Sequence, residues 1–203
     1  MNDTKKNNSI IQKSAIAAIA TPVGEGGIAV IRVSGKDAIS LVNKAFQGRD
    51  LTSLDSHTVH FGKIIDKNKL PVDEVLVTLF HSPRSYTSEE TVEISCHGGV
   101  LVTQKVLETI LSLGVKAAEA GEFTQRAFLN GKLDLDQAEA VADIIHATSI
   151  KAVDAAHQQL EGKLGDYVRT FRQQIIDATA MIELELDFIE EDVEFANKEQ
   201  LQK

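Results

Sequence analysis

The sequence predicts an α+β protein, in which a mixed-sheet N-terminal domain is followed by an all-α segment. Strand-like and helix-like segments alternate from residue 15 to about residue 120, as in folds that pack helices against a sheet. After Gly121 no proline occurs, and a helical periodicity of apolar residues takes over. The 203 residues, 43% of them hydrophobic, suffice for one large or two small domains with a real core.

The N-terminal part of the chain is expected to contain a polar arm and then a sheet. Residues 1–14 are polar and are predicted to form a disordered arm. Runs of β-branched and alternating residues then predict strands at 15–20, 28–34, 58–66, 73–81, 91–96 and 115–120. The pattern of 15–20 fits a strand or a helix, and the Pro22 and glycine loop after it favours the strand. We therefore expect an α/β domain over residues 15–120.

Two helices are predicted inside this sheet domain. The first follows Gly35 and has Phe46 on its apolar side. The second runs from Leu101 to Leu113, and Gly114 ends it. In both, apolar residues recur at spacings of three and four, so each helix has one apolar face.

Residues 121–203 are expected to be the start of a helical domain. Its predicted helices cover 123–130, 135–145 and 150–189. The last is long and amphipathic, and Gly162 and Gly165 lower its helix propensity locally. Because a helix of this length leaves an apolar stripe that needs a partner, we expect either that the natural protein continues after Lys203 or that a second copy covers the stripe.

The charge balance narrows the classes of function. With 21 basic and 30 acidic residues the net charge is −9, which makes this chain alone a poor candidate for tight nucleic-acid binding. Seven of the acids lie between Glu183 and Glu194, where a solvated helix face explains them better than a divalent-metal site. The sequence has no membrane span, no signal peptide and a single cysteine, Cys96, and these features indicate the cytoplasm.

Three charged residues occupy positions where a purely structural chain rarely places a charge: Arg32, Glu93 and Lys132. Arg32 and Glu93 alternate with apolar residues in predicted strands, and a charge in mid-strand is costly unless it is paired or solvated. Lys132 follows a tight turn at Asn130-Gly131. The structural interpretation is an open sheet face with an Arg32–Glu93 salt bridge, and an ordinary exposed lysine at 132.

The functional interpretation of the same residues is a small-molecule site. The Glu93 carboxylate is suited to accept two N–H donors from a flat heterocycle such as a pterin. A folate joins such a ring to an anionic glutamate tail, which would suit Arg32 or Lys132. The residues alone leave both interpretations open.

Other candidate sites in the sequence are weak. The glycine loop at 24–27 lacks the spacing of the nucleotide-binding motifs. One cysteine beside one histidine is too few ligands for zinc, so Cys96 is expected in the core and His97 in a turn. We therefore predict no metal site and no catalytic residue in this chain.

Three phrases of the sequence resemble the tRNA modification GTPases that act on wobble uridine: TPVGEGGIAVIRVSG (21–35), SYTSEETVEISCHGG (85–99) and GEFTQRAFLNGKLDLDQAEAVADII (121–145). The resemblance covers the chain from about Ser14 to about Glu191. It implies that the N-terminal domain is similar to folate-dependent aminomethyltransferases, forms a homodimer and binds 5-formyltetrahydrofolate. By the same resemblance, the folate-binding residues are Arg32, Glu93 and Lys132.

For the intact family protein, the resemblance implies a reaction with a partner protein that contains FAD. Together they add an aminomethyl or carboxymethylaminomethyl group at C5 of the wobble uridine in tRNA, and GTP hydrolysis with Mg²⁺ and K⁺ drives the cycle. No GxxxxGK[ST] phosphate loop occurs in the 203 residues. A GTPase domain is therefore expected after residue 203, and this chain alone is expected to be inactive as a GTPase.

Two alternatives stay open at this point. The chain is a ligand-free dimerisation module, in which Arg32 and Glu93 form a structural pair, or it is a free-standing folate-dependent aminomethyltransferase. In addition, Glu25 stands in the glycine loop where many members of the family carry arginine, so the sequence assigns that loop no role.

Overall fold

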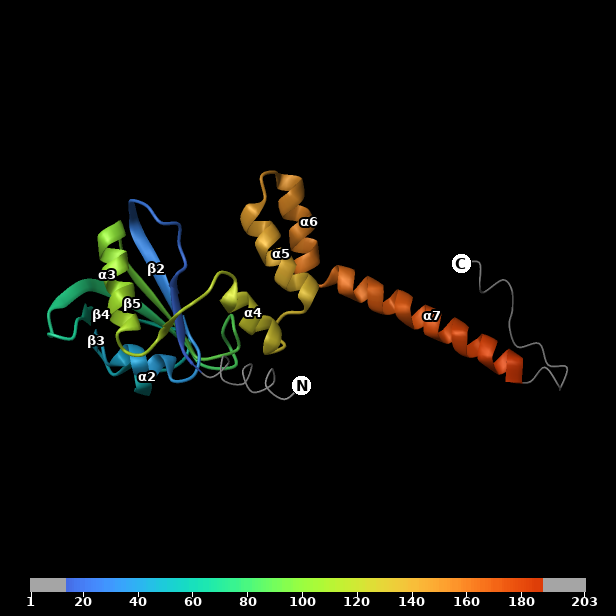
Figure 1. Cartoon of the computed structure of the whole chain (residues 1–203), viewed down its shortest axis with the longest axis horizontal. Helices are drawn as coiled ribbons and strands as arrows, with labels where there is room; N and C mark the ends of the chain where they lie inside the picture. The colour runs from blue at the N-terminus through green and yellow to red at the C-terminus, as the bar shows by residue number, and fades with distance from the viewer. Residues whose placement is uncertain (1–13, 188–203) are drawn as a thin grey trace. The chain divides into compact units, whose positions relative to one another are not determined.

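A computed structural model describes residues 14–187 of the chain. The chain divides into two compact units, Met1–Asp134 and Leu135–Lys203, and Figure 1 shows the sheet of the first and the helices of the second. The first unit is a sheet with helices and the second is helical, so the predicted α+β class is confirmed. The predicted arm at 1–14 lies, apart from Ser14, outside the described residues.

The sheet of the first unit is mixed and has seven strands in the order β3-β4-β5-β6-β2-β1-β7. The strands are β1 (Ile16–Ile19), β2 (Gly26–Ser34), β3 (Phe46–Gln47), β4 (Thr58–Ile65), β5 (Pro71–Phe80), β6 (Thr91–Gly98) and β7 (Lys116–Ala117). Every neighbouring pair is antiparallel except β1 and β7, which run parallel. The neighbouring strands β2 and β6 carry Arg32 and Glu93 of the candidate site.

Strand β3 corrects one sequence prediction, which placed Phe46 on the apolar side of a helix. The helix after Gly35, α2 (Ala38–Asn43), ends before that residue. Phe46 instead pairs with Ile64 of β4 and is only 7% exposed. Burial of the aromatic ring at the edge of the sheet outweighs continuation of the helical pattern.

The apolar core lies on one face of the sheet, where α2 and α3 (Val100–Leu111) supply its helical side. Side chains alternate between the two faces along a strand, so the fully buried Ile31 and Ile94 point into this core. Their neighbours Arg32 and Glu93 therefore point to the opposite face. On that face Phe61 of β4 is 64% exposed, so the part of the face at β4 is open, whereas the ring of Phe123 lies over Arg32.

Helix α4 (Glu122–Leu129) is fixed to the first unit by a buried arginine. Arg126 is only 2% exposed. Its guanidinium forms ion pairs with Glu89, at 3.3 Å, and with Glu122, at 2.8 Å, and donates a hydrogen bond to the carbonyl oxygen of Ser14 at 2.9 Å. A buried charge is tolerated when it is paired and hydrogen-bonded in this way. A short 3₁₀ segment, η1 (Leu51–Ser53), completes the unit.

The second unit begins with a pair of helices, α5 (Leu135–His146) and α6 (Ile150–Leu160). The small side chains of Ala140 and Ala156 are its buried residues among those described. Two glutamine side chains join the helices: Gln137 donates to the carbonyl oxygen of Leu160 at 2.8 Å, and Gln159 to that of Asp136 at 3.0 Å. The first bond satisfies the carbonyl of the last residue of α6, which has no intrahelical partner, and the second adds a bond to a carbonyl in the first turn of α5.

The prediction of one continuous helix over 150–189 is wrong. Gly162 has a φ of 77°, a left-handed conformation that a helix cannot continue through. The helical pattern is therefore divided into α6 and α7 (Lys163–Asp187).

The second half of the acidic run that ends at Glu194 lies outside the described residues. No helix in the described part of the chain combines the length and the apolarity that a membrane crossing requires.

Candidate functional site

Arg32 and Glu93 face each other across the antiparallel strands β2 and β6, where they occupy paired register positions. The Nη2 and Nε atoms of Arg32 both donate to Oε1 of Glu93, at 2.7 and 2.9 Å. Their side chains are 25% and 27% exposed. The structure therefore brings these two predicted site residues together as an ion pair, on the sheet face away from the core.

The pair keeps hydrogen-bonding capacity for a further molecule. Because both bonds end on Oε1 of Glu93, Oε2 of Glu93 and Nη1 of Arg32 have no hydrogen-bond partner among the described residues. A carboxylate accepts several hydrogen bonds and a guanidinium donates up to five. A partly exposed ion pair contributes only about 0 to 1 kcal/mol to stability, so stability alone is a weak reason for these charges.

Two aromatic rings hold the Arg32 guanidinium in place. Its Cζ lies 5.0 Å from the ring centroid of Tyr86 and 5.6 Å from that of Phe123, within the range of cation–π attraction. The Tyr86 hydroxyl is hydrogen-bonded to Oγ1 of Thr124 in α4, at 2.8 Å. Tyr86 and Phe123 both lie in the quoted phrases, but their role beside Arg32 was not predicted, because no spacing rule relates them to Arg32.

The loop that carries Tyr86 is tied to its surroundings by polar contacts. Thr87 is fully buried, and its hydroxyl lies 2.6 Å from that of Ser34 in β2. Asn130 donates to the carbonyl oxygen of Thr87 at 2.7 Å, and the Ser85 hydroxyl donates to that of Glu89 at 2.6 Å. Satisfied buried hydrogen bonds rigidify a local structure, so Tyr86 is presented to the charge pair on a fixed loop.

Lys132 and Tyr86 both line a hollow of 610 Å³. In the described structure Lys132 forms no ion pair with Glu93. Tyr86 nevertheless connects the two places, because it lines the hollow and also contacts Arg32. The volume lies within the range of about 300 to 1,000 Å³ that is usual for small-molecule sites.

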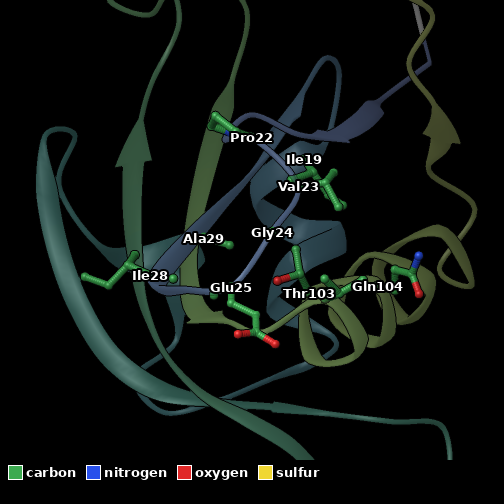
Figure 2. A pocket seen from close by; sticks show the side chains of 12 residues that line it. Ile19, Pro22, Val23, Gly24, Glu25, Ile28, Ala29, Thr103 and Gln104 are labelled. Carbon is green, nitrogen blue, oxygen red and sulfur yellow. The ribbon is translucent and has the colours of Figure 1, made fainter.

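The glycine loop borders a different and smaller hollow, of 180 Å³. Figure 2 shows the loop side chains Val23 and Glu25 with Thr103 and Gln104 of α3. Glu25 is the charged residue among those that line it, so an anion near the start of α3 would meet a carboxylate. This hollow is therefore less suited to an anionic ligand than the one beside Tyr86.

Close packing explains part of the glycine content near this loop. A Cβ atom at Gly98 would lie 2.5 Å from the carbonyl oxygen of Gly26 on the paired strand, closer than any side chain tolerates. The two strands approach each other here through a register shift between Gly26 and Ile28. Glycine at position 98 is therefore explained by the close approach of the two strands, and no ligand is needed to explain it.

The predictions for the Cys96–His97 pair have different outcomes. Cys96 is 3% exposed in the core, as predicted, and burial raises the pKa of its thiol above the ordinary value of 9.0. His97 was expected in a turn, but it lies in β6, where its backbone N–H and Nδ1 contact the Asp73 carboxylate at 2.8 and 2.7 Å. Because the Asp73 carboxylate accepts the hydrogen bond of the His97 N–H, the backbone stays extended and β6 continues through His97. The described residues contain no cluster of histidine, cysteine, aspartate and glutamate fit to hold a metal ion.

Comparisons with known proteins match both units. Residues 15–132 match the family described as GTP-binding protein TrmE N-terminus, and residues 135–203 match the MnmE helical domain. The tRNA modification GTPase MnmE of Lactobacillus johnsonii is 46% identical over 195 residues, which cover 96% of this chain and 42% of that protein.

Two further relatives carry the same name and have a similar identity to this chain. The tRNA modification GTPase MnmE of Flavobacterium johnsoniae is 48% identical over 194 residues, covering 94% of this chain and 41% of the relative. The tRNA modification GTPase MnmE of Bacillus cytotoxicus is 49% identical over 178 residues, which cover 87% of this chain and 39% of that relative. The chain thus spans about two fifths of the length of the curated relatives that it matches.

Proposed function

The chain belongs to the family of the tRNA modification GTPase MnmE, and we propose that its first unit binds a reduced folate that carries a one-carbon unit. The observation that supports this most directly is the Arg32–Glu93 pair on the sheet face away from the core. It keeps one carboxylate oxygen and one guanidinium nitrogen without a hydrogen-bond partner among the described residues. In its specific form the proposal names 5-formyltetrahydrofolate as the ligand.

Each residue has a role that its position supports. Glu93 accepts N–H donors of the pterin ring, for which its Oε2 atom is available. Arg32 orients that carboxylate and stands at the start of the glutamate tail, held by Tyr86. Lys132, at the hollow beyond Tyr86, supplies a positive charge for a carboxylate of the tail. The folate, when bound, supplies the one-carbon unit, and these side chains bind and orient it.

For the whole protein we propose the family's reaction. The one-carbon unit becomes part of an aminomethyl or carboxymethylaminomethyl group at C5 of the wobble uridine of tRNA, made in the cytoplasm together with a partner protein that contains FAD. GTP hydrolysis with Mg²⁺ and K⁺ belongs to a GTPase domain. Because the 203 residues contain no GxxxxGK[ST] loop, we propose that this chain alone hydrolyses no GTP and shows no aminomethyl-transfer turnover.

We also propose that the first unit forms a homodimer through the open part of this sheet face, at β4 and β5. Three large apolar side chains on β4 and β5 are strongly exposed there: Val59, at 57%, Phe61, at 64%, and Leu76, at 45%. Exposed apolar patches of this kind mark interaction surfaces. A Phe61→Asp variant is expected to sediment as a monomer where the unchanged chain sediments as a dimer, and a monomeric unchanged chain would contradict this part of the proposal.

The same surface favours a second candidate function, a dimerisation module without a ligand, in which the Arg32–Glu93 ion pair is purely structural. Titration calorimetry with 5-formyltetrahydrofolate separates the two. The folate proposal expects binding to the unchanged chain and a loss of roughly tenfold to a hundredfold in Glu93→Gln, since a hydrogen bond to a charged group contributes about 1.5 to 3 kcal/mol.

The chain offers a matched control on the same sheet. Glu74 of β5 forms a cross-strand ion pair with Lys63 at 3.0 Å, so Glu74→Gln removes a comparable charge away from Arg32. This variant is expected to bind the folate like the unchanged chain. Absence of folate binding to the unchanged chain would favour the ligand-free module, and unchanged binding by a folded Glu93→Gln protein would remove Glu93 from the site.

A further inference from the structure

We propose that the hollow beside Tyr86 binds the additional carboxylates of a folate with a poly-γ-glutamate tail, and that Arg84 is a binding residue for that tail. This inference rests on the proposed folate site and extends it from the ring and first glutamate to the rest of the ligand. It predicts that the protein selects folates by the length of the tail.

The charge of the hollow is opposite to that of the chain. The chain has 30 acidic and 21 basic residues, yet the described residues that line the hollow include Arg84, Lys132 and His57 and no acid. Apolar side chains of Phe80, Pro83 and Tyr86 form other parts of its wall. A cationic hollow with low-dielectric walls attracts an anion more strongly than an open surface does.

The two permanent cations of the hollow are unpaired in the described structure. Neither Arg84 nor Lys132 forms an ion pair with a described residue, and both side chains are exposed. The nearby acid Glu89 is already paired with Arg126. Positive charge is therefore available in the hollow for a ligand, and the chain itself does not neutralise it.

The backbone holds both cations on tight turns. The N–H of Arg84 donates to the carbonyl oxygen of His81 at 2.9 Å, and the Ser82 hydroxyl donates to that of Ser88 at 2.9 Å, which closes the loop. The N–H of Lys132 donates to the carbonyl oxygen of Ala127 at 2.8 Å. A preorganised pair of cations loses less entropy on binding than two on flexible segments.

The position of the hollow fits a tail in particular. Tyr86 lines the hollow and also contacts Arg32 of the Arg32–Glu93 pair, so a ligand whose ring lies at Glu93 reaches the hollow by way of Tyr86. The hollow opens broadly to solvent, which lets a chain of γ-linked glutamates lengthen without a clash. Each added glutamate brings one more carboxylate to Arg84 and Lys132.

The test is titration calorimetry of the full chain with 5-formyltetrahydrofolate carrying one or three γ-linked glutamates. The triglutamate is expected to bind roughly tenfold more tightly at low salt, and the difference is expected to shrink as salt screens the exposed charges. In Arg84→Gln the triglutamate is expected to fall to the affinity of the monoglutamate, whose own affinity stays unchanged.

Arg49→Gln is the matched control, because Arg49 is another exposed arginine of the first unit and does not line the hollow. It is expected to keep the full preference for the triglutamate. Equal affinities of the two folates for the unchanged chain, or an equal loss of both in Arg84→Gln, would overturn this inference and leave the proposed function in place. Failure of both folates to bind would overturn the proposed function and the inference with it.

Discussion

The two units of the chain differ in how much of their structure is supported by a core. The first unit encloses a continuous apolar cluster between the sheet and the helices α2 and α3. In the described part of the second unit Ala140 and Ala156 are the buried apolar residues, while Tyr167, Phe171 and Ile175 of α7 are more than half exposed. Because apolar burial is the main stabilising term in folding, we expect the first unit to supply most of the folding free energy of the described residues.

This difference explains where the candidate site lies. The sheet tolerates Arg32 and Glu93 on one face because Ile31 and Ile94, their neighbours along the strands, are fully buried on the other. A rigid sheet also holds binding groups more precisely than a loop does. The unit with a core of its own is therefore the one that carries the Arg32–Glu93 pair.

The largest expected effect concerns the buried charge of the first unit. Arg126→Ala removes the cation that pairs with Glu89 and Glu122, whose side chains are only 12% and 11% exposed. Since an unpaired buried carboxylate is costly, the free energy of unfolding is expected to fall by about 3 to 5 kcal/mol. Urea unfolding followed by circular dichroism measures this loss, and a change under about 1 kcal/mol would mean that the network is solvated.

A smaller effect tests the comparison of the two units directly. Ile94→Val removes one methylene group from the core of the first unit and is expected to cost about 0.5 to 1.5 kcal/mol of unfolding free energy. The same change at Ile175, which is 53% exposed, is expected to cost less than about 0.5 kcal/mol. Equal losses of unfolding free energy at Ile94 and Ile175, measured by urea unfolding, would show that α7 is packed in solution. That result would contradict the difference in core packing between the two units.

The smallest effect on stability concerns the thiol of Cys96. Burial raises its pKa above 9.0, so the neutral thiol is favoured in the folded state. Its contribution to stability is complete below pH 9.0 and is lost as the pH rises through the folded-state value. At pH 8 a disulfide reagent is expected to label the folded protein roughly a hundredfold more slowly than the urea-unfolded protein, and fast labelling of the folded chain would show that the core at Cys96 is open.

The sequence was sufficient for the fold class, and it placed Arg32 and Glu93 in strands, each facing away from its apolar neighbours, because alternation along a strand decides which side chains share a face. It left open whether the two residues form a structural pair or a ligand site, since alternation does not decide which strands lie side by side or in what register. The division of the last predicted helix by Gly162 was missed, since the left-handed φ of that residue is a property of the folded backbone and many glycines inside helices lack it.

Other parts of the site could not be predicted from the sequence. Arg126 lies in a helical pattern as an ordinary surface arginine would, and its burial depends on Glu89 and Ser14, which are far away along the chain. The same holds for Tyr86, whose contact with Arg32 and whose place in the hollow arise from the path of the loop. Long-range packing of this kind leaves no periodic signal.

The central claim is that a reduced folate binds the sheet face at the Arg32–Glu93 pair. The most direct test is a titration of the isotope-labelled chain with 5-formyltetrahydrofolate, followed by the chemical shifts of its backbone amides. We predict the largest shifts at Arg32, Tyr86, Glu93 and Lys132, and small ones at Thr103 beside the glycine loop. Shifts centred on Thr103, or no shifts at saturating folate, would contradict the claim.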